Sequence, residues 1–86
     1  FNIMLIVFGK DYCPYCQNTK KILNIKGTKY TYCSLEETKN DKLVTFLREL
    51  KLIPNNHNTI PIVINYMNRN PIFIGGYDNL VAFLDE

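Results

Sequence analysis

Two cysteines stand two residues apart near the N-terminus, in the run Cys13-Pro14-Tyr15-Cys16. A pair at this spacing can close a small disulfide ring or contribute to a metal site. Proline is favourable at the first helical position, because its missing N–H has no partner there in any case. We therefore expect Cys13 at a helix N-terminus, where unpaired N–H groups and the helix dipole favour a thiolate. The thiolate is the reactive form of cysteine, so the motif favours redox chemistry.

Strands and helices are expected to alternate around this motif. Residues 3–8 form a continuous apolar run, which favours a strand buried on both faces. Residues 14–26 predict the helix that carries the cysteines, and Gly27 is well placed to end it. Residues 29–34 alternate in polarity and are rich in β-forming side chains, so they predict a second strand.

The second half of the chain is expected to add a helix, a hairpin and a last helix. Asn40 or Asp41 is a plausible N-cap for the middle helix, which reaches about residue 52. Its inward face is expected to hold Leu43, Val44 or Phe46, Leu47 and Leu50. Residues 60–65 and 72–74 flank a run of turn residues and predict an antiparallel hairpin. Asp78 or Asn79 is a plausible cap for the helix expected at 80–84.

The expected order, βαβαββα, predicts an α/β fold in a single domain, residues 1–86. The first two strands are expected to be parallel, because a right-handed crossover through the first helix connects them. With the hairpin they give a four-stranded mixed sheet flanked by three helices. A hydrophobic content of 47% is normal for a globular chain with one core.

The net charge, the lengths of the apolar runs and the cysteine count argue against several classes of protein. A formal net charge of +2, without a dense block of lysine or arginine, argues against nucleic-acid binding. Apolar runs stay well short of the ~20 residues that span a bilayer, so no membrane association and no signal peptide are expected. Three cysteines, an odd number, fit poorly with a secreted disulfide-stapled fold. We therefore expect a reducing, cytoplasmic setting.

Three landmarks together resemble a known family. They are the run Cys13-Pro14-Tyr15-Cys16, then Thr59-Ile60-Pro61, then Gly75-Gly76-Tyr77-Asp78. In this order and spacing they look like those of a dithiol glutaredoxin of the CPYC type, most similar to the small phage and viral members. The resemblance covers essentially the whole chain. It implies a thioredoxin fold and a glutathione-disulfide oxidoreductase that takes part in electron transport.

The resemblance assigns different roles to the two cysteines. Cys13 is expected to be the nucleophile that attacks a disulfide and carries the glutathionyl group as a mixed disulfide. Cys16 is expected to resolve that intermediate when the substrate is a protein dithiol. Glutathione would then reduce the Cys13–Cys16 disulfide.

The resemblance also implies a glutathione site made of Lys10, Tyr15, Ile60, Pro61, Gly76, Tyr77 and Asp78. Pro61 matches the family's cis-proline and turns the Ile60 backbone toward the nucleophile, where it can pair with the cysteine unit of glutathione. Lys10 is expected to meet the glycine carboxylate and the thiolate. Tyr77 N–H and Asp78 match the γ-glutamyl site.

The expected partners follow from the same resemblance. They are glutathione as co-substrate and disulfide-containing proteins, of which ribonucleotide reductase is a common client in the family. No tightly bound cofactor and no resident metal are expected, and the protein is expected to be a monomer.

Three other interpretations stay open at this point. The cysteine pair could belong to a structural zinc site with Cys33 and His57, although His57 is more simply a solvated loop residue and Cys33 a strand residue. The chain could be a glutaredoxin-like electron donor reduced by thioredoxin reductase. It could also bind an iron–sulfur cluster between two protomers, against which Pro14 counts because cluster-binding relatives usually have a smaller residue there.

Overall fold

Four strands form one mixed sheet in the computed structural model, which describes residues 3–67 and 69–85. The elements are β1 (Leu5–Gly9), α1 (Pro14–Ile25), β2 (Tyr30–Ser34), α2 (Thr38–Glu49), β3 (Ile62–Met67), β4 (Asn70–Gly75) and α3 (Tyr77–Leu84). The strand order is β2-β1-β3-β4, with β1 parallel to β2 and antiparallel to β3, and β4 antiparallel to β3. The predicted α/β architecture and its element order are confirmed.

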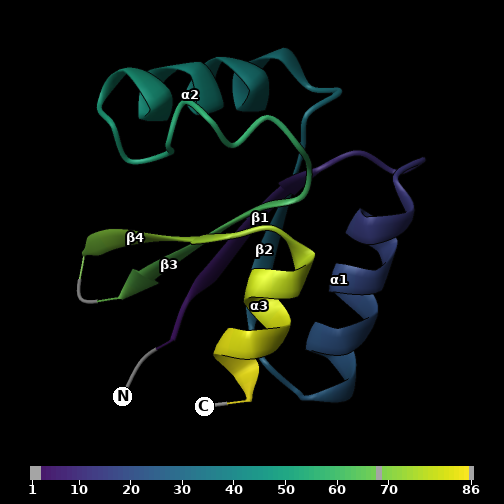
Figure 1. Ribbon diagram of the computed structural model, residues 1–86. Helices are drawn as coiled ribbons and strands as arrows, with labels where there is room; N and C mark the ends of the chain where they lie inside the picture. The colour runs from purple at the N-terminus through teal and green to yellow at the C-terminus, as the bar shows by residue number, and fades with distance from the viewer. Residues whose placement is uncertain (1–2, 68, 86) are drawn as a thin grey trace.

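The helices cover both faces of the sheet (Figure 1). Helix α2 lies over one face, and α1 and α3 lie side by side over the other. None of the described helices is long and apolar enough to cross a membrane.

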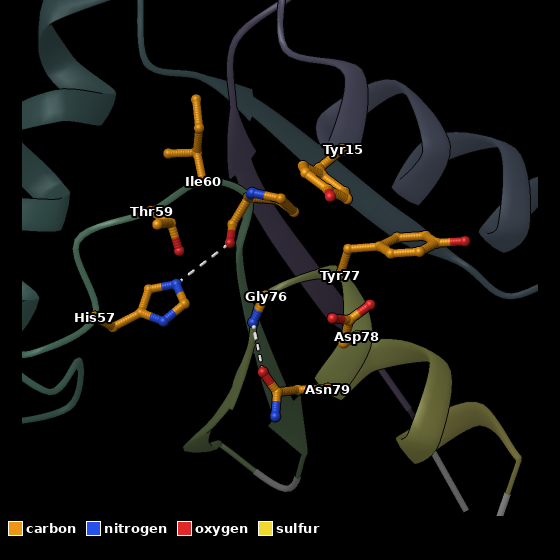
Figure 2. A pocket seen from close by; sticks show the side chains of 9 residues that line it. Tyr15, His57, Thr59, Ile60, Gly76, Tyr77, Asp78 and Asn79 are labelled. Atoms are coloured by element: carbon orange, nitrogen blue, oxygen red, sulfur yellow. Dashed lines mark hydrogen bonds between the residues drawn. The ribbon is translucent and has the colours of Figure 1, made fainter.

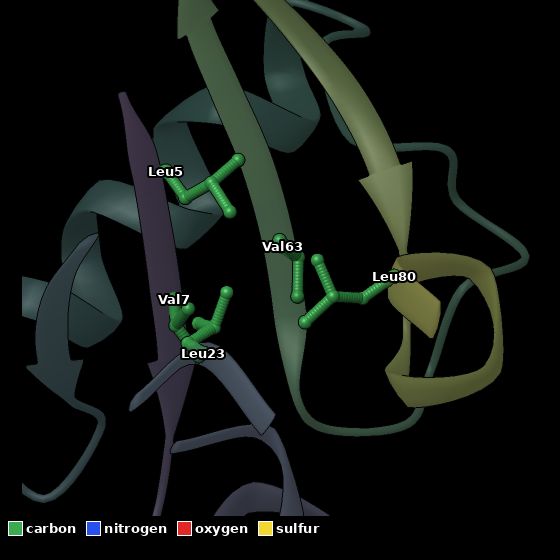
Figure 3. Close-up of a cluster of buried hydrophobic side chains, with 5 residues drawn as sticks. All are labelled: Leu5, Val7, Leu23, Val63 and Leu80. Atoms are coloured by element: carbon green, nitrogen blue, oxygen red, sulfur yellow. The ribbon is translucent and has the colours of Figure 1, made fainter. Parts of the chain in front are cut away.

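One core cluster joins the sheet to α1 and α3. It consists of five completely buried side chains, Leu5, Val7, Leu23, Val63 and Leu80 (Figure 3). Burying a Leu or Val side chain of this kind stabilises the fold by about 1.5–3 kcal/mol. Because Leu23 comes from α1 and Leu80 from α3, this cluster sets the positions of both helices that carry candidate site residues.

A second cluster lies between the sheet and α2. Its buried members are Phe8, Val44, Ile53, Ile62 and Ile64. The inward face expected for α2 is only partly right: Val44 is buried, Leu47 is half-buried, and the other three side chains, Leu43, Phe46 and Leu50, are exposed. Ile53, from the loop after α2, is completely buried in this cluster, so part of the face is covered by the loop and not by the helix.

Helix α2 begins earlier than its sequence signals indicated. Its first residue is Thr38, and Glu37 is the N-cap, so the predicted caps Asn40 and Asp41 are wrong. The physical reason is a tertiary hydrogen bond: the Asn40 side chain is buried and donates from Nδ2 to the Ser34 carbonyl, 2.9 Å away. Asn40 thus ties α2 to the end of β2 and does not cap the helix.

Helix α1 ends as predicted. Gly27 follows the last turn with a φ of 65°, the left-handed conformation that glycine adopts most easily. Thr28 N–H donates to the Leu23 carbonyl at 3.0 Å, and Gly27 N–H donates to the Asn24 carbonyl at 3.2 Å. These two bonds satisfy carbonyls that the end of the helix leaves without partners.

Candidate active site

Cys13 is the N-cap residue of α1. Its backbone is extended, with φ −91° and ψ 116°, and Pro14 is the first helical residue, as predicted. The Cys13 sulfur accepts a hydrogen bond from the backbone N–H of Cys16 at 3.3 Å. A helix N-terminal donor aimed at the sulfur stabilises the negative charge that the thiolate carries.

Cys16 lies one turn further along α1 and is completely buried, whereas 9% of Cys13 is exposed. Burial, with a smaller contribution from the hydrogen bond to Cys13, raises the pKa of the Cys16 thiol to about 11. At neutral pH Cys16 is therefore a neutral thiol that solvent does not reach. A disulfide partner meets Cys13 first.

The loop before β3 reaches Cys13 from a distant part of the sequence. The Ile60–Pro61 peptide bond is cis, as the resemblance implied. The Cys13 thiol points at the Ile60 carbonyl, with 3.9 Å between Sγ and the oxygen. The Ile60 backbone thus lies next to the Cys13 sulfur.

A cavity of about 270 Å³ opens beside this contact (Figure 2). It is lined by Tyr15, His57, Thr59, Ile60, Pro61, Gly76, Tyr77, Asp78 and Asn79. Six of the seven residues proposed for the binding site line this cavity, and Lys10 does not. Three elements build it, namely the start of α1, the loop before β3 and the start of α3.

Two tyrosines form one wall. The ring centroids of Tyr15 on α1 and Tyr77 on α3 lie 6.1 Å apart, at 40° to each other. Figure 2 shows the Asp78 carboxylate beside Tyr77, on the same end of α3. This wall combines apolar ring surface with a carboxylate, as a site for an extended polar ligand requires.

The N-terminus of α3 faces the same cavity. The helix begins at Tyr77 with Gly76 as its N-cap, so the predicted caps Asp78 and Asn79 are wrong. Asn79 instead accepts a hydrogen bond at Oδ1 from Gly76 N–H, 3.1 Å away. Because this bond occupies the donor just outside the helix and Asp78 need not cap it, the Asp78 carboxylate is available to a ligand. The first helical N–H groups lack acceptors within the helix and suit an anion.

His57 lines the cavity, although its sequence context predicted a solvated loop residue. Its Nε2 lies 3.4 Å from the Pro61 carbonyl, and its ring meets the edge of Phe73 with centroids 5.1 Å apart. These contacts leave the side chain half-buried. Its position two residues before Thr59 was the one signal in the sequence that it lies near the site.

Lys10 lies outside the cavity that the other six predicted binding residues line. Its ammonium lies 5.7 Å from the centroid of the exposed Tyr12 ring. A side-chain hydrogen bond to Tyr12 is the main reason why the pKa of Lys10 is raised above its ordinary value. The Lys10 backbone carbonyl accepts from Cys13 N–H at 3.2 Å, so the residue stands next to the nucleophile but outside the cavity lining.

The zinc interpretation receives no support from the geometry. Among the described residues there is no group of three or more His, Cys, Asp and Glu side chains that could hold a metal ion. Cys33 lies half-buried on β2, and His57 lies at the cavity.

A buried cysteine pair at a helix N-terminus, beside a four-stranded sheet and a cis-proline, is the arrangement of the thioredoxin fold. The Glutaredoxin family model matches residues 5–65. The chain therefore belongs to the glutaredoxin family. The CPYC subclass and a viral origin remain predictions.

Individual relatives agree with this family. A glutaredoxin of Ricinus communis is 38% identical over 55 residues, which cover 59% of this chain and 54% of the relative, so the chain spans about half the length of that curated protein. A wheat glutaredoxin structure is 28% identical, with a TM-score of 0.69 over 94% of this chain and 71% of that one.

Two further structures extend the comparison. The buckwheat glutaredoxin–glutathione complex is 27% identical, with a TM-score of 0.70 over 96% of this chain and 69% of that one. Glutaredoxin 1 of Francisella tularensis has a TM-score of 0.77 over 98% of this chain and 94% of that one. At 16% identity the latter shows the fold alone.

Proposed function

We propose that the protein is a glutathione-dependent oxidoreductase that reduces protein disulfides and glutathione mixed disulfides. The observation that carries this proposal is the cavity lined by Ile60 and Asp78, because the Ile60 carbonyl also lies 3.9 Å from the Cys13 thiol. A tripeptide with its thiol at Cys13 can extend along this surface. The similarity to a glutaredoxin solved with glutathione supports the same ligand.

Each part of glutathione has a complementary group in the proposed site. The backbone of Ile60 can pair with the cysteine unit, as a strand adds to a sheet edge. Asp78 can accept hydrogen bonds from the γ-glutamyl ammonium, and the N–H groups that begin α3 can bind the adjacent carboxylate.

We propose that Lys10 binds the glycine carboxylate of glutathione. Its ammonium faces solvent over the Tyr12 ring, next to Cys13, and a long flexible side chain can turn from there toward a ligand on the nucleophile. Arg48 is less suited to this role, because its guanidinium donates to the Pro54 carbonyl at 3.0 Å.

The reaction proceeds by two exchanges at Cys13. Its thiolate attacks one sulfur of a disulfide, a new S–S bond forms, and the other sulfur leaves as a thiolate. With a protein disulfide as substrate, Cys16 attacks Cys13 Sγ, closes the Cys13–Cys16 disulfide and releases the second thiol of the reduced protein. Two glutathione molecules then reduce that disulfide and become one glutathione disulfide.

The setting and clients are proposed on the same basis. An odd number of cysteines supports a reducing, cytoplasmic compartment. The clients are disulfide-containing proteins, with ribonucleotide reductase as the family's common example, and the protein acts as a monomer without a tightly bound cofactor.

A comparison of two reducing systems tests the proposal. Reduction of a small mixed disulfide is followed by NADPH consumption, once with glutathione and glutathione reductase and once with thioredoxin reductase alone. We expect turnover with the first system. Turnover with thioredoxin reductase only would make the chain a glutaredoxin-like electron donor instead. Visible absorption bands in anaerobically purified protein would support the iron–sulfur alternative.

A further inference from the structure

The Tyr32 side chain lies beside the cysteine pair, and the exchange reaction described above does not involve it. It lies on β2, and its hydroxyl is buried without a hydrogen-bond partner of standard geometry among the described residues. A buried hydroxyl without a partner costs free energy and is uncommon in folded proteins. Such a hydroxyl is free to donate a hydrogen bond in another chemical state of the protein.

The Tyr32 hydroxyl and the Cys16 sulfur both lie next to the Cα of Gly9. A Cβ placed on Gly9 would lie 2.7 Å from Cys16 Sγ and 2.7 Å from Tyr32 Oη. The parallel register of β1 and β2, which pairs Val7 with Tyr32, sends the phenol toward the start of α1. Glycine at position 9 leaves room for both atoms.

Burial, followed by the neighbouring acidic groups, keeps the Tyr32 phenol protonated. Burial first, and then the neighbouring Cys16, Asp11 and Cys13, raise the pKa of Tyr32 above its ordinary value. The Lys20 ammonium lies 4.0 Å from the centroid of the Tyr32 ring, and Asp11 lies 3.8 Å from that ammonium. Tyr32 is thus a hydrogen-bond donor throughout the neutral pH range.

We propose that the Tyr32 hydroxyl donates a hydrogen bond to the Cys16 sulfur whenever that sulfur carries negative charge. A thiol sulfur is a weak acceptor and a thiolate is a strong one, so the bond strengthens as charge develops. This makes Tyr32 a specific support for the second cysteine, separate from the helix N-terminus that supports Cys13. The same contact acts on the pKa of Cys16 in the direction opposite to burial.

Charge develops on Cys16 at two points of the cycle. In the resolving step Cys16 loses its proton, its sulfur attacks Cys13 Sγ, the Cys13–Cys16 bond forms, and the substrate sulfur leaves with the electron pair of the broken bond and takes up a proton. In the reduction step a thiol reductant attacks Cys13, and Cys16 leaves as a thiolate that then takes a proton. Tyr32 keeps its own proton in both steps.

The inference requires only thiol–disulfide exchange, and it does not depend on glutathione as the reductant. Its test uses an aromatic disulfide that releases a coloured thiol, 5,5′-dithiobis(2-nitrobenzoate). Attack by Cys13 releases the first coloured thiol in a step that depends on reagent concentration. Attack by Cys16 releases the second in an intramolecular step that does not. Stopped-flow absorbance separates these two phases.

We expect Tyr32→Phe to slow the second phase about tenfold, the effect of losing one hydrogen bond to a charged group. The first phase should stay within about twofold, which also shows that the variant is folded and its nucleophile intact. The rate of the second phase rises with pH as Cys16 ionises, and in the variant this rise should move to higher pH. Tyr30→Phe is the matched control, because the Tyr30 hydroxyl bonds to the Asn24 side chain on the exposed surface.

Two outcomes would overturn the inference. One is a second phase in Tyr32→Phe with the rate and pH profile of the unmodified protein. The other is an equal slowing of both phases, which would give Tyr32 only a packing role. Both outcomes leave glutathione dependence untouched, because the assay contains no glutathione.

Discussion

The sulfur of Cys13 accepts a hydrogen bond from the backbone N–H of Cys16 at 3.3 Å, across the first turn of α1. The Cys16 side chain, which belongs to the same helix, is completely buried. One short motif therefore gives its two cysteines opposite environments. The first accepts a helix N–H at its sulfur and is 9% exposed, and the second is a completely buried, neutral thiol.

Limited alkylation should distinguish the two thiols. Cys16 has a pKa raised to about 11 by burial, and burial also raises the pKa of Cys33. With less than one equivalent of iodoacetamide at pH 7, we expect peptide mapping to find the label on Cys13. Below its pKa, modification of Cys16 should rise about tenfold per pH unit, because only the thiolate reacts. Label on Cys16 at pH 7 equal to that on Cys13 would contradict this assignment.

Gly9→Ala should disturb the packing of Cys16 and thereby slow closure of the Cys13–Cys16 disulfide. The added Cβ would come within 2.7 Å of both Cys16 Sγ and Tyr32 Oη, and Cys16 is held by its helix. We expect a loss of about 1–3 kcal/mol in the free energy of unfolding, from denaturant titration, together with slower disulfide closure. Gly27→Ala is the control: it puts alanine at a φ of 65° with open space around it. It should cost about 1–2 kcal/mol but leave thiol exchange rates unchanged.

Asp78→Asn should weaken binding of the glutathione part of a substrate. The substitution removes the negative charge at the start of α3 and keeps the shape of the side chain. We expect KM for a glutathionylated peptide to rise about three- to tenfold with kcat nearly unchanged, because the carboxylate is exposed and the lost bond is screened. Asp85→Asn, just after the other end of the same helix, is the control and should leave KM unchanged. Equal KM values for the unmodified protein, Asp78→Asn and Asp85→Asn would show that Asp78 does not bind glutathione.

Leu80→Ala should loosen α3 and the cavity wall that it carries. Leu80 is completely buried against the sheet, so its truncation is expected to cost about 2–5 kcal/mol in unfolding free energy. Leu43→Ala on α2 removes the same atoms from a side chain that is 41% exposed and should cost less than about 1 kcal/mol. Thermal or denaturant unfolding gives both values. Similar losses at the two positions would conflict with the core described above.

Local patterns were sufficient to predict the element order, and the resemblance to dithiol glutaredoxins supplied the three site landmarks. Pro14 places Cys13 at a helix N-terminus through its own backbone chemistry, and Gly27 ends α1 in the same local way. Such signals need only a few neighbouring residues. Six proposed binding residues converge on one cavity because a single fold brings those three landmarks together.

The predictions that failed depend on contacts between distant segments. Asn40 is a good cap by residue type, but the end of β2 offers its side chain a buried carbonyl. The proximity of Tyr32 to Cys16 follows from the register of β1 and β2, which no local pattern encodes. His57 lies in a loop without periodicity, so apart from its closeness to Thr59 in the sequence, the folded path of that loop is what shows that it reaches the cavity.

The central claim is that Cys13 alone can exchange with glutathione while Cys16 resolves protein disulfides. The most direct measurement is turnover of a glutathionylated peptide, coupled to glutathione reductase and NADPH, for Cys13→Ser and Cys16→Ser. We expect Cys13→Ser to be inactive and Cys16→Ser to keep most of the activity of the unmodified protein. Equal loss in the two variants would contradict these roles.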